Sequence, residues 1–233
     1  TLALLLLHLP KLRKLDFSFF SALLLLETFQ QVASKNAPVD SVPVFQELTD
    51  VMFNGCDEKE PNLPDLFFAC FGLPTVKRIH ANRLGDNMQD EPTAVVAEME
   101  PRSSSVEFVE MRCSKLWHND LVNVQRACKK LKTLIYEVGT TWAWYPVKFS
   151  VIQKALAPHR DYIEELCISH EAFHPYKEGE QMEEELEPMR FQGFESLRSL
   201  KIAPVYIFGQ ETMDIELAPE DEAASKKLGE ALL

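Results

Sequence analysis

The sequence predicts an α/β fold in which parallel strands stack side by side into a single curved solenoid, with a helix between successive strands. Two observations lead to this prediction: a recurring apolar triplet, and helix-like segments between its copies. The triplet has apolar residues at offsets of zero, three and five, as in Leu197, Leu200 and Ile202. Any half-buried strand can supply this spacing, so the prediction depends on the recurrence of the triplet and not on a single copy.

The triplet recurs along the whole chain. Its central residues are separated by 36, 28, 30, 25, 32 and 34 residues. The copies are Leu12-Leu15-Phe17, Leu48-Val51-Phe53, Val76-Ile79-Ala81, Val106-Val109-Met111, Leu131-Leu134-Tyr136, Ile163-Leu166-Ile168 and Leu197-Leu200-Ile202. We therefore expect about seven irregular repeats of 25 to 36 residues, each adding one strand to a shared core.

Helix-like segments lie between the triplets. The expected helices cover residues 22–33, 64–71, 119–128, 149–156 and 223–233. Pro64 suits the first turn of its helix, and Asn119 can cap the next one. Strands that alternate with crossover helices are parallel. Because triplets flank the acidic run 176–188 on both sides, we expect one domain over residues 1–233, with this run as an inserted loop.

The composition limits the possible partners and compartments. The chain has 233 residues, 46% of them hydrophobic, which is ample for a core. Its net charge of -12 argues against a nucleic-acid partner. Five scattered cysteines without a CxxC spacing indicate a reducing compartment, so we expect an intracellular protein, cytoplasmic or nuclear. The apolar start of the chain is too short to span a membrane, and no membrane partner is expected.

The pattern L-x-x-L-x-L, with a strand and a helix in each unit, resembles the leucine-rich repeat family over residues 9–233. That family usually has Asn or Cys three residues after the last apolar position, and only Cys56 meets this rule here. The units are therefore degenerate. Uneven units with the phrases LPKLRKLDF, LKTLIYEVG, ALAPHRDYIEEL and FESLRSLKIAPVYIFG resemble fungal F-box proteins with a C-terminal repeat domain.

The resemblance implies a concave parallel sheet, a convex side of helices and irregular segments, and a non-enzymatic function. In such proteins an N-terminal F-box docks on the Skp-type adaptor of a cullin ubiquitin ligase, and the repeats hold the protein substrate. No F-box-like LPxE segment opens this chain, so we expect a fragment of a longer protein that lacks the adaptor-binding part. A structural repeat scaffold unrelated to ubiquitin would share the fold and differ in its partners.

The residues beside the triplets are the first candidates for partner binding, because side chains alternate across a strand. The middle row is expected to hold Asp16, Met52, His80, Glu110, Ile135, Cys167 and Lys201, with Arg112 in a flanking row. Its charges have both signs, which suits a protein partner better than a polyanion. A second candidate is the aromatic loop with Trp142, Trp144 and Tyr145, which either anchors a partner or packs on the core.

Residues 170–174 match the pattern H-E-x-x-H. On a helix this pattern sets His170 and His174 on one face for zinc, with Glu171 as the base. However, Pro175 follows the second histidine at once, and no third ligand follows at the usual spacing. We therefore expect no metal and no cofactor, and a zinc hydrolase stands as the alternative to a binding module.

Overall fold

The structure, a computed structural model, describes residues 8–18, 23–34, 44–54, 63–84, 99–114, 116, 118–139, 149–170, 189–203 and 207. In this part of the chain, seven strands form one open sheet, and the order of the strands in the sheet is their order along the sequence. They are β1 Lys14–Ser18, β2 Asp50–Asn54, β3 Arg78–Asn82, β4 Phe108–Ser114, β5 Thr133–Val138, β6 Glu165–His170 and β7 Ser199–Ile202. Every neighbouring pair is parallel, so the predicted α/β class and parallel sheet are confirmed.

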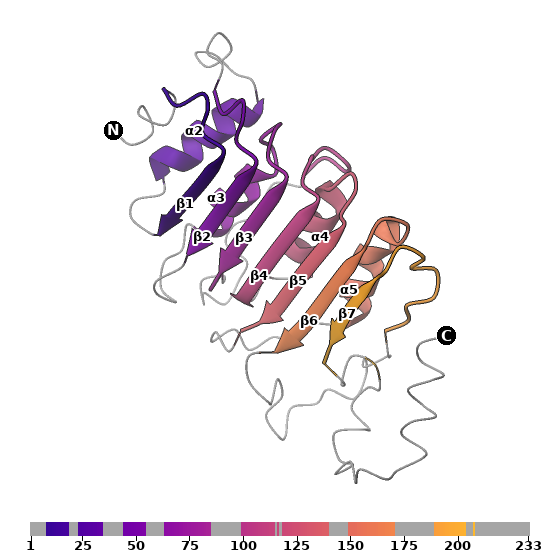
Figure 1. The fold of residues 1–233 in the computed structure, drawn as a ribbon. Coiled ribbons are helices and arrows are strands. Elements are labelled where there is room, and N and C mark those ends of the chain that lie inside the picture. Colours follow the sequence, from indigo (N-terminus) through magenta and orange to yellow (C-terminus); the bar gives the residue numbers. More distant parts are fainter. Residues whose placement is uncertain are drawn as a thin grey trace, which may run out of the picture.

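The α-helices that the structure describes lie together on one side of this sheet (Figure 1). They are α2 Leu23–Ser34, α3 Leu63–Cys70, α4 His118–Ala127 and α5 Phe149–Leu156, and a short 3-10 helix, η2 Ala157–His159, follows α5. Each α-helix agrees with its expected range to within one residue, whereas the expected helix 223–233 lies outside the described residues. No helix among the described residues is long and apolar enough to cross a membrane.

The predicted register of the strands is confirmed. The central triplet residues are Cα partners across the sheet, in the order Leu15, Val51, Ile79, Val109, Leu134, Leu166 and Leu200. The five on the inner strands are fully buried. Leu15 and Leu200, on the two edge strands, are half-buried. The triplets therefore build the face of the sheet that packs against the helices.

A repeated backbone contact joins each unit to the next. The carbonyl oxygen two residues before the central triplet residue accepts hydrogen bonds from two consecutive N–H groups of the following unit. This occurs at all six strand junctions, with Arg13, Thr49, Lys77, Glu107, Lys132 and Glu164 as the acceptors, at 2.8–3.1 Å. The units therefore share backbone geometry as well as an apolar pattern, although their lengths differ.

Aromatic side chains fill the core between the first strands and their helices. The rings of Phe53, Phe68 and Phe71 surround Phe67 edge to face, with centroid distances of 5.3–5.9 Å. A Cβ at Gly72 would lie 2.6 Å from a side-chain atom of α2, so only glycine allows α2 to come this close to the end of α3.

The helix layer also holds one buried histidine. The Nε2 of His159 lies 2.6 Å from the carbonyl oxygen of Gln125, and its Nδ1 accepts a hydrogen bond of 3.3 Å from the N–H of Leu131. Nε2 therefore carries the proton, and a neutral ring satisfies both contacts. Burial lowers the pKa of His159, which agrees with a structural role.

Candidate functional site

The face of the sheet opposite the helices is the candidate site, and no described element lies over it. We call it the uncovered face. Its middle row runs in register through Asp16, Met52, His80, Glu110, Ile135, Cys167 and Lys201. The structure therefore places all seven predicted residues in one row. Met52 is 38% exposed, Asp16 and Lys201 are exposed, and the other four are half-buried.

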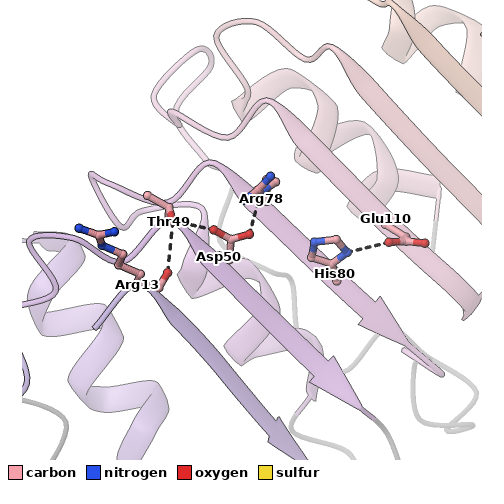
Figure 2. A network of polar contacts seen from close by, with 6 residues as sticks. All are labelled: Arg13, Thr49, Asp50, Arg78, His80 and Glu110. Atoms are coloured by element: carbon pink, nitrogen blue, oxygen red, sulfur yellow. Dashed lines mark hydrogen bonds and ion pairs between the residues drawn. The ribbon is translucent and has the colours of Figure 1, made fainter. Parts of the chain in front are cut away.

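At the centre of this face, three polar side chains from β3 and β4 meet. Nδ1 of His80 lies 2.6 Å from Oε2 of Glu110 (Figure 2). The Nε of Arg112 donates to the other carboxylate oxygen of Glu110. The ring of His80 also lies against that of Phe108, with 4.8 Å between the centroids. Because two paired strands carry all three residues, the fold itself brings His80, Glu110 and Arg112 together, without the help of a partner.

The carboxylate of Glu110 is charged at neutral pH. Partial burial is the largest single influence and raises the pKa of Glu110, because it disfavours the charged form. The hydrogen bonds from His80 and Arg112 and the charge of Arg112 together outweigh burial and hold this pKa below its usual value. The Glu110 side chain keeps only 17% of its surface exposed. The cluster thus presents a carboxylate whose two oxygens are already paired.

A second ion pair lies beside this cluster, on β2 and β3. The Nε of Arg78 donates to Oδ1 of Asp50 at 2.6 Å, and the Thr49 hydroxyl donates to Oδ2 at 2.6 Å (Figure 2). Burial raises the pKa of Asp50, but the hydrogen bonds from Arg78 and Thr49 and the charges of Arg78 and Lys14 lower it more. Asp50 was not predicted from the sequence. The available signal was its opposite charge to Arg78 at the same position of the next repeat.

A row of alternating charges lies where the strands begin. It occupies the position of the shared carbonyl acceptors and reads Lys77, Glu107, Lys132, Glu164 and Arg198. Lys132 lies 2.7 Å from Glu107, Lys77 lies 3.8 Å from it, and Arg198 lies 3.9 Å from Glu164. The hydrogen bond from Lys132 lowers the pKa of Glu107. The alternation is visible in the sequence only when the repeats are aligned. Because these charges pair with each other across neighbouring strands, they support the register of the strands rather than forming a binding site.

The remaining predicted residues are not brought together. Asp16 accepts a hydrogen bond from Asn54 at 3.0 Å near one edge of the sheet, and Lys201 lies at the other edge. Six strand spacings separate them, or about 29 Å. Ile135 lies between these edges, next to the central cluster. The aromatic loop with Trp142, Trp144 and Tyr145 lies outside the described residues.

The pattern at residues 170–174 is described only at its start. His170 is the last residue of β6, so it belongs to a strand. Residues 171–174 lie outside the described part. Among the described residues, no group of three or more His, Cys, Asp or Glu side chains is arranged to hold a metal ion.

The chemistry of the uncovered face suits recognition. Its carboxylates at Asp50 and Glu110 are paired, so a partner that covers them buries no isolated charge. Met52, Phe108 and Ile135, on β2, β4 and β5, supply apolar surface beside these pairs. Compared with family models, curated proteins and solved structures, the chain matches none of them, and its resemblance to repeat-containing F-box proteins stays a prediction.

Proposed function

We propose that this chain is a non-enzymatic recognition module whose uncovered face binds a partner protein. The observation that carries the proposal is the hydrogen-bonded cluster of His80, Glu110 and Arg112 at the centre of a face formed by seven strands in register. Protein interfaces combine apolar surface with charges that are satisfied by hydrogen bonds. Met52, beside His80 in the middle row, supplies exposed apolar surface next to this cluster.

We further propose that the fold is a leucine-rich-repeat solenoid and that the partner is a substrate of an F-box ubiquitin ligase. Sequential parallel strands, helices on one side of the sheet and a shared carbonyl contact at every junction support a repeat fold. The link to ubiquitin rests on the resemblance of the repeat phrases alone. In this proposal, the uncovered face is the concave side that holds the substrate.

The binding proposal is tested by affinity purification of the full-length protein from its own cells, with quantitative mass spectrometry. Met52→Arg places a large charged side chain on the uncovered face next to His80, and we expect it to reduce at least one co-purified protein about tenfold. Leu9→Arg is the matched control, because Leu9 is similarly exposed, at 40%, but precedes β1. A set of co-purified proteins that Met52→Arg and Leu9→Arg leave equally unchanged would contradict the proposal.

The same purification tests the ligase assignment separately. A Skp-type adaptor and a cullin should co-purify with the full-length protein, and Met52→Arg should not affect them, since the adaptor binds outside this face. If the Met52-dependent partner is recovered without adaptor or cullin, the chain is a recognition module of another kind. This outcome would overturn the ligase assignment and leave the binding face in place.

A further inference from the structure

A group of cations lies at the edge of the sheet where β4 and β5 begin. Two segments meet there: residues 99–105, which lead into β4, and residues 126–130, which run from the end of α4 toward β5. The N–H of Arg102 donates to the carbonyl of Arg126 at 2.9 Å, and the N–H of Lys129 donates back to the first segment at 3.1 Å. The two segments are therefore held side by side by their own backbones.

We call Arg102, Arg126, Lys129 and Lys130 the basic cluster. All four side chains are exposed, and none forms an ion pair with another described residue. The Nζ of Lys130 lies 5.4 Å from the ring centroid of Tyr162, on the next turn of the same edge. The two segments contain four cations and a single carboxylate, Glu100. Their net charge is positive.

This cluster differs from its surroundings in two ways. The whole chain carries a net charge of -12, so a local excess of positive charge runs against its overall balance. The neighbouring cations Lys77, Lys132 and Arg198 begin at the same edge of the sheet, but each lies within 4 Å of a glutamate. The four cations of the basic cluster thus form no ion pair within the described part of the chain, and the contact of Lys130 with the Tyr162 ring leaves its charge exposed.

We propose that the basic cluster is a second docking surface, which binds a short acidic segment of a partner protein. Carboxylates form the strongest hydrogen bonds that arginine and lysine side chains can donate to a peptide. Exposed charges act over about 8 Å at physiological ionic strength, so a short segment interacts mainly with the cluster. A nucleic acid or an anionic membrane extends further and meets the acidic remainder of the chain, which repels it.

The test uses the 233-residue chain and a fluorescein-labelled peptide of glutamates, with binding followed by fluorescence anisotropy. We expect binding at about 50 mM salt that weakens at least about tenfold near 300 mM, because screening removes the attraction. Lys129→Glu/Lys130→Glu should weaken binding by at least about tenfold, since it reverses two of the charges. Arg102→Glu, on the other segment, should weaken it in the same direction.

The control is Lys11→Glu/Lys154→Glu. It changes the net charge of the chain by the same amount, at two exposed lysines outside the cluster. Lys11 precedes β1, and four strand spacings, or about 19 Å, separate β1 from β5. Each variant must first show the same thermal transition as the wild type. If Lys129→Glu/Lys130→Glu does not, the binding of Arg102→Glu tests the proposal in its place. Equal losses in the control and the cluster variants would overturn the proposal, as would absence of binding by the wild type.

Two further outcomes would reassign the surface. Tighter binding of a DNA duplex than of the glutamate peptide would point to nucleic acid and overturn the proposal. Concentration-dependent dimerisation that Lys129→Glu/Lys130→Glu abolishes would assign the site to a second copy of this chain instead. Neither outcome bears on the uncovered face, because Met52 and His80 are unchanged in all these variants.

Discussion

The two faces of one sheet follow different rules in this protein. Toward the helices, the aligned positions from Val51 to Leu166 are all apolar and fully buried. On the uncovered face, the next residue along each strand changes from methionine to histidine, glutamate, isoleucine and cysteine. The buried face is constrained because every strand must pack on the same core. The uncovered face lacks this constraint, so its residues can serve recognition.

The largest expected effect comes from placing the same charge on either face of β5. Leu134→Asp puts an unpaired carboxylate in the core and should cost more than about 4 kcal/mol, enough to abolish the cooperative transition. Ile135→Asp, one residue along on the uncovered face, should cost about 1 kcal/mol. Urea denaturation followed by circular dichroism measures both variants. Similar losses for the two would contradict the assignment of the faces.

The cysteines offer a chemical version of the same comparison. Cys128 is buried in the helix layer, and burial raises the pKa of its thiol to about 12. At pH 8 only on the order of 10⁻⁴ of this thiol is ionised, so it should resist alkylation. Burial also raises the pKa of Cys70. Cys113 and Cys167 are half-buried, and iodoacetamide should label them before Cys70 and Cys128 in the native protein.

Peptide mapping by mass spectrometry reads out this order of labelling. Urea should remove the difference among the four thiols, which serves as the control. Native labelling of Cys128 as fast as Cys167 would show that the helix layer does not protect its thiols.

The difference between the centre and the edge of the buried face sharpens the comparison. Leu134→Ala should cost about 3 kcal/mol, because the site is fully enclosed and a cavity remains. Leu200→Ala, at the same position of the edge strand β7, should cost about half as much, since Leu200 is already half-buried. Midpoints of urea denaturation give both values. A larger loss at Leu200 would indicate a core centred elsewhere.

The smallest expected effect is the pH dependence of the uncovered face. The pKa of Glu110 is lower in the folded chain than its usual value of 4.5. Its contribution to stability is therefore complete above that value and is lost as the pH falls through the lower, folded pKa. The contribution is about 1 kcal/mol or less, because solvent screens the cluster.

Replacing the carboxylate isolates this effect. Glu110→Gln should be slightly less stable than the wild type at pH 7, and the two should converge toward pH 3. Thermal denaturation at both pH values checks this. A difference that stays constant with pH would show that Glu110 acts through packing rather than charge.

The sequence was sufficient to predict the fold wherever every repeat must meet the same packing requirement. The triplets predicted the register of all seven strands, because a residue that points into a shared core must be apolar in each unit. Alternation then predicted the row from Asp16 to Lys201. The contacts within that row could not be predicted in this way. The contact between His80 and Glu110 depends on their side-chain rotamers, and the two residues are 30 positions apart in the sequence.

The basic cluster was hidden for a related reason. Arg102 and Lys129 are far apart in sequence, and only the contact between their two turns brings them together. The overall charge of -12 pointed away from any basic surface. Net charge describes the chain as a whole, whereas recognition depends on where the charges lie.

The central claim is that the uncovered face, rather than the helix side, contacts a partner protein. Site-specific photocrosslinking tests it most directly, with p-benzoylphenylalanine in place of Met52 on the uncovered face or of Lys154 on α5, in full-length protein in its own cells. We expect a discrete protein adduct from position 52 that Ile135→Arg abolishes, and none of that mass from position 154. An adduct from position 154 alone, or an adduct at 52 that Ile135→Arg leaves unchanged, would contradict the account.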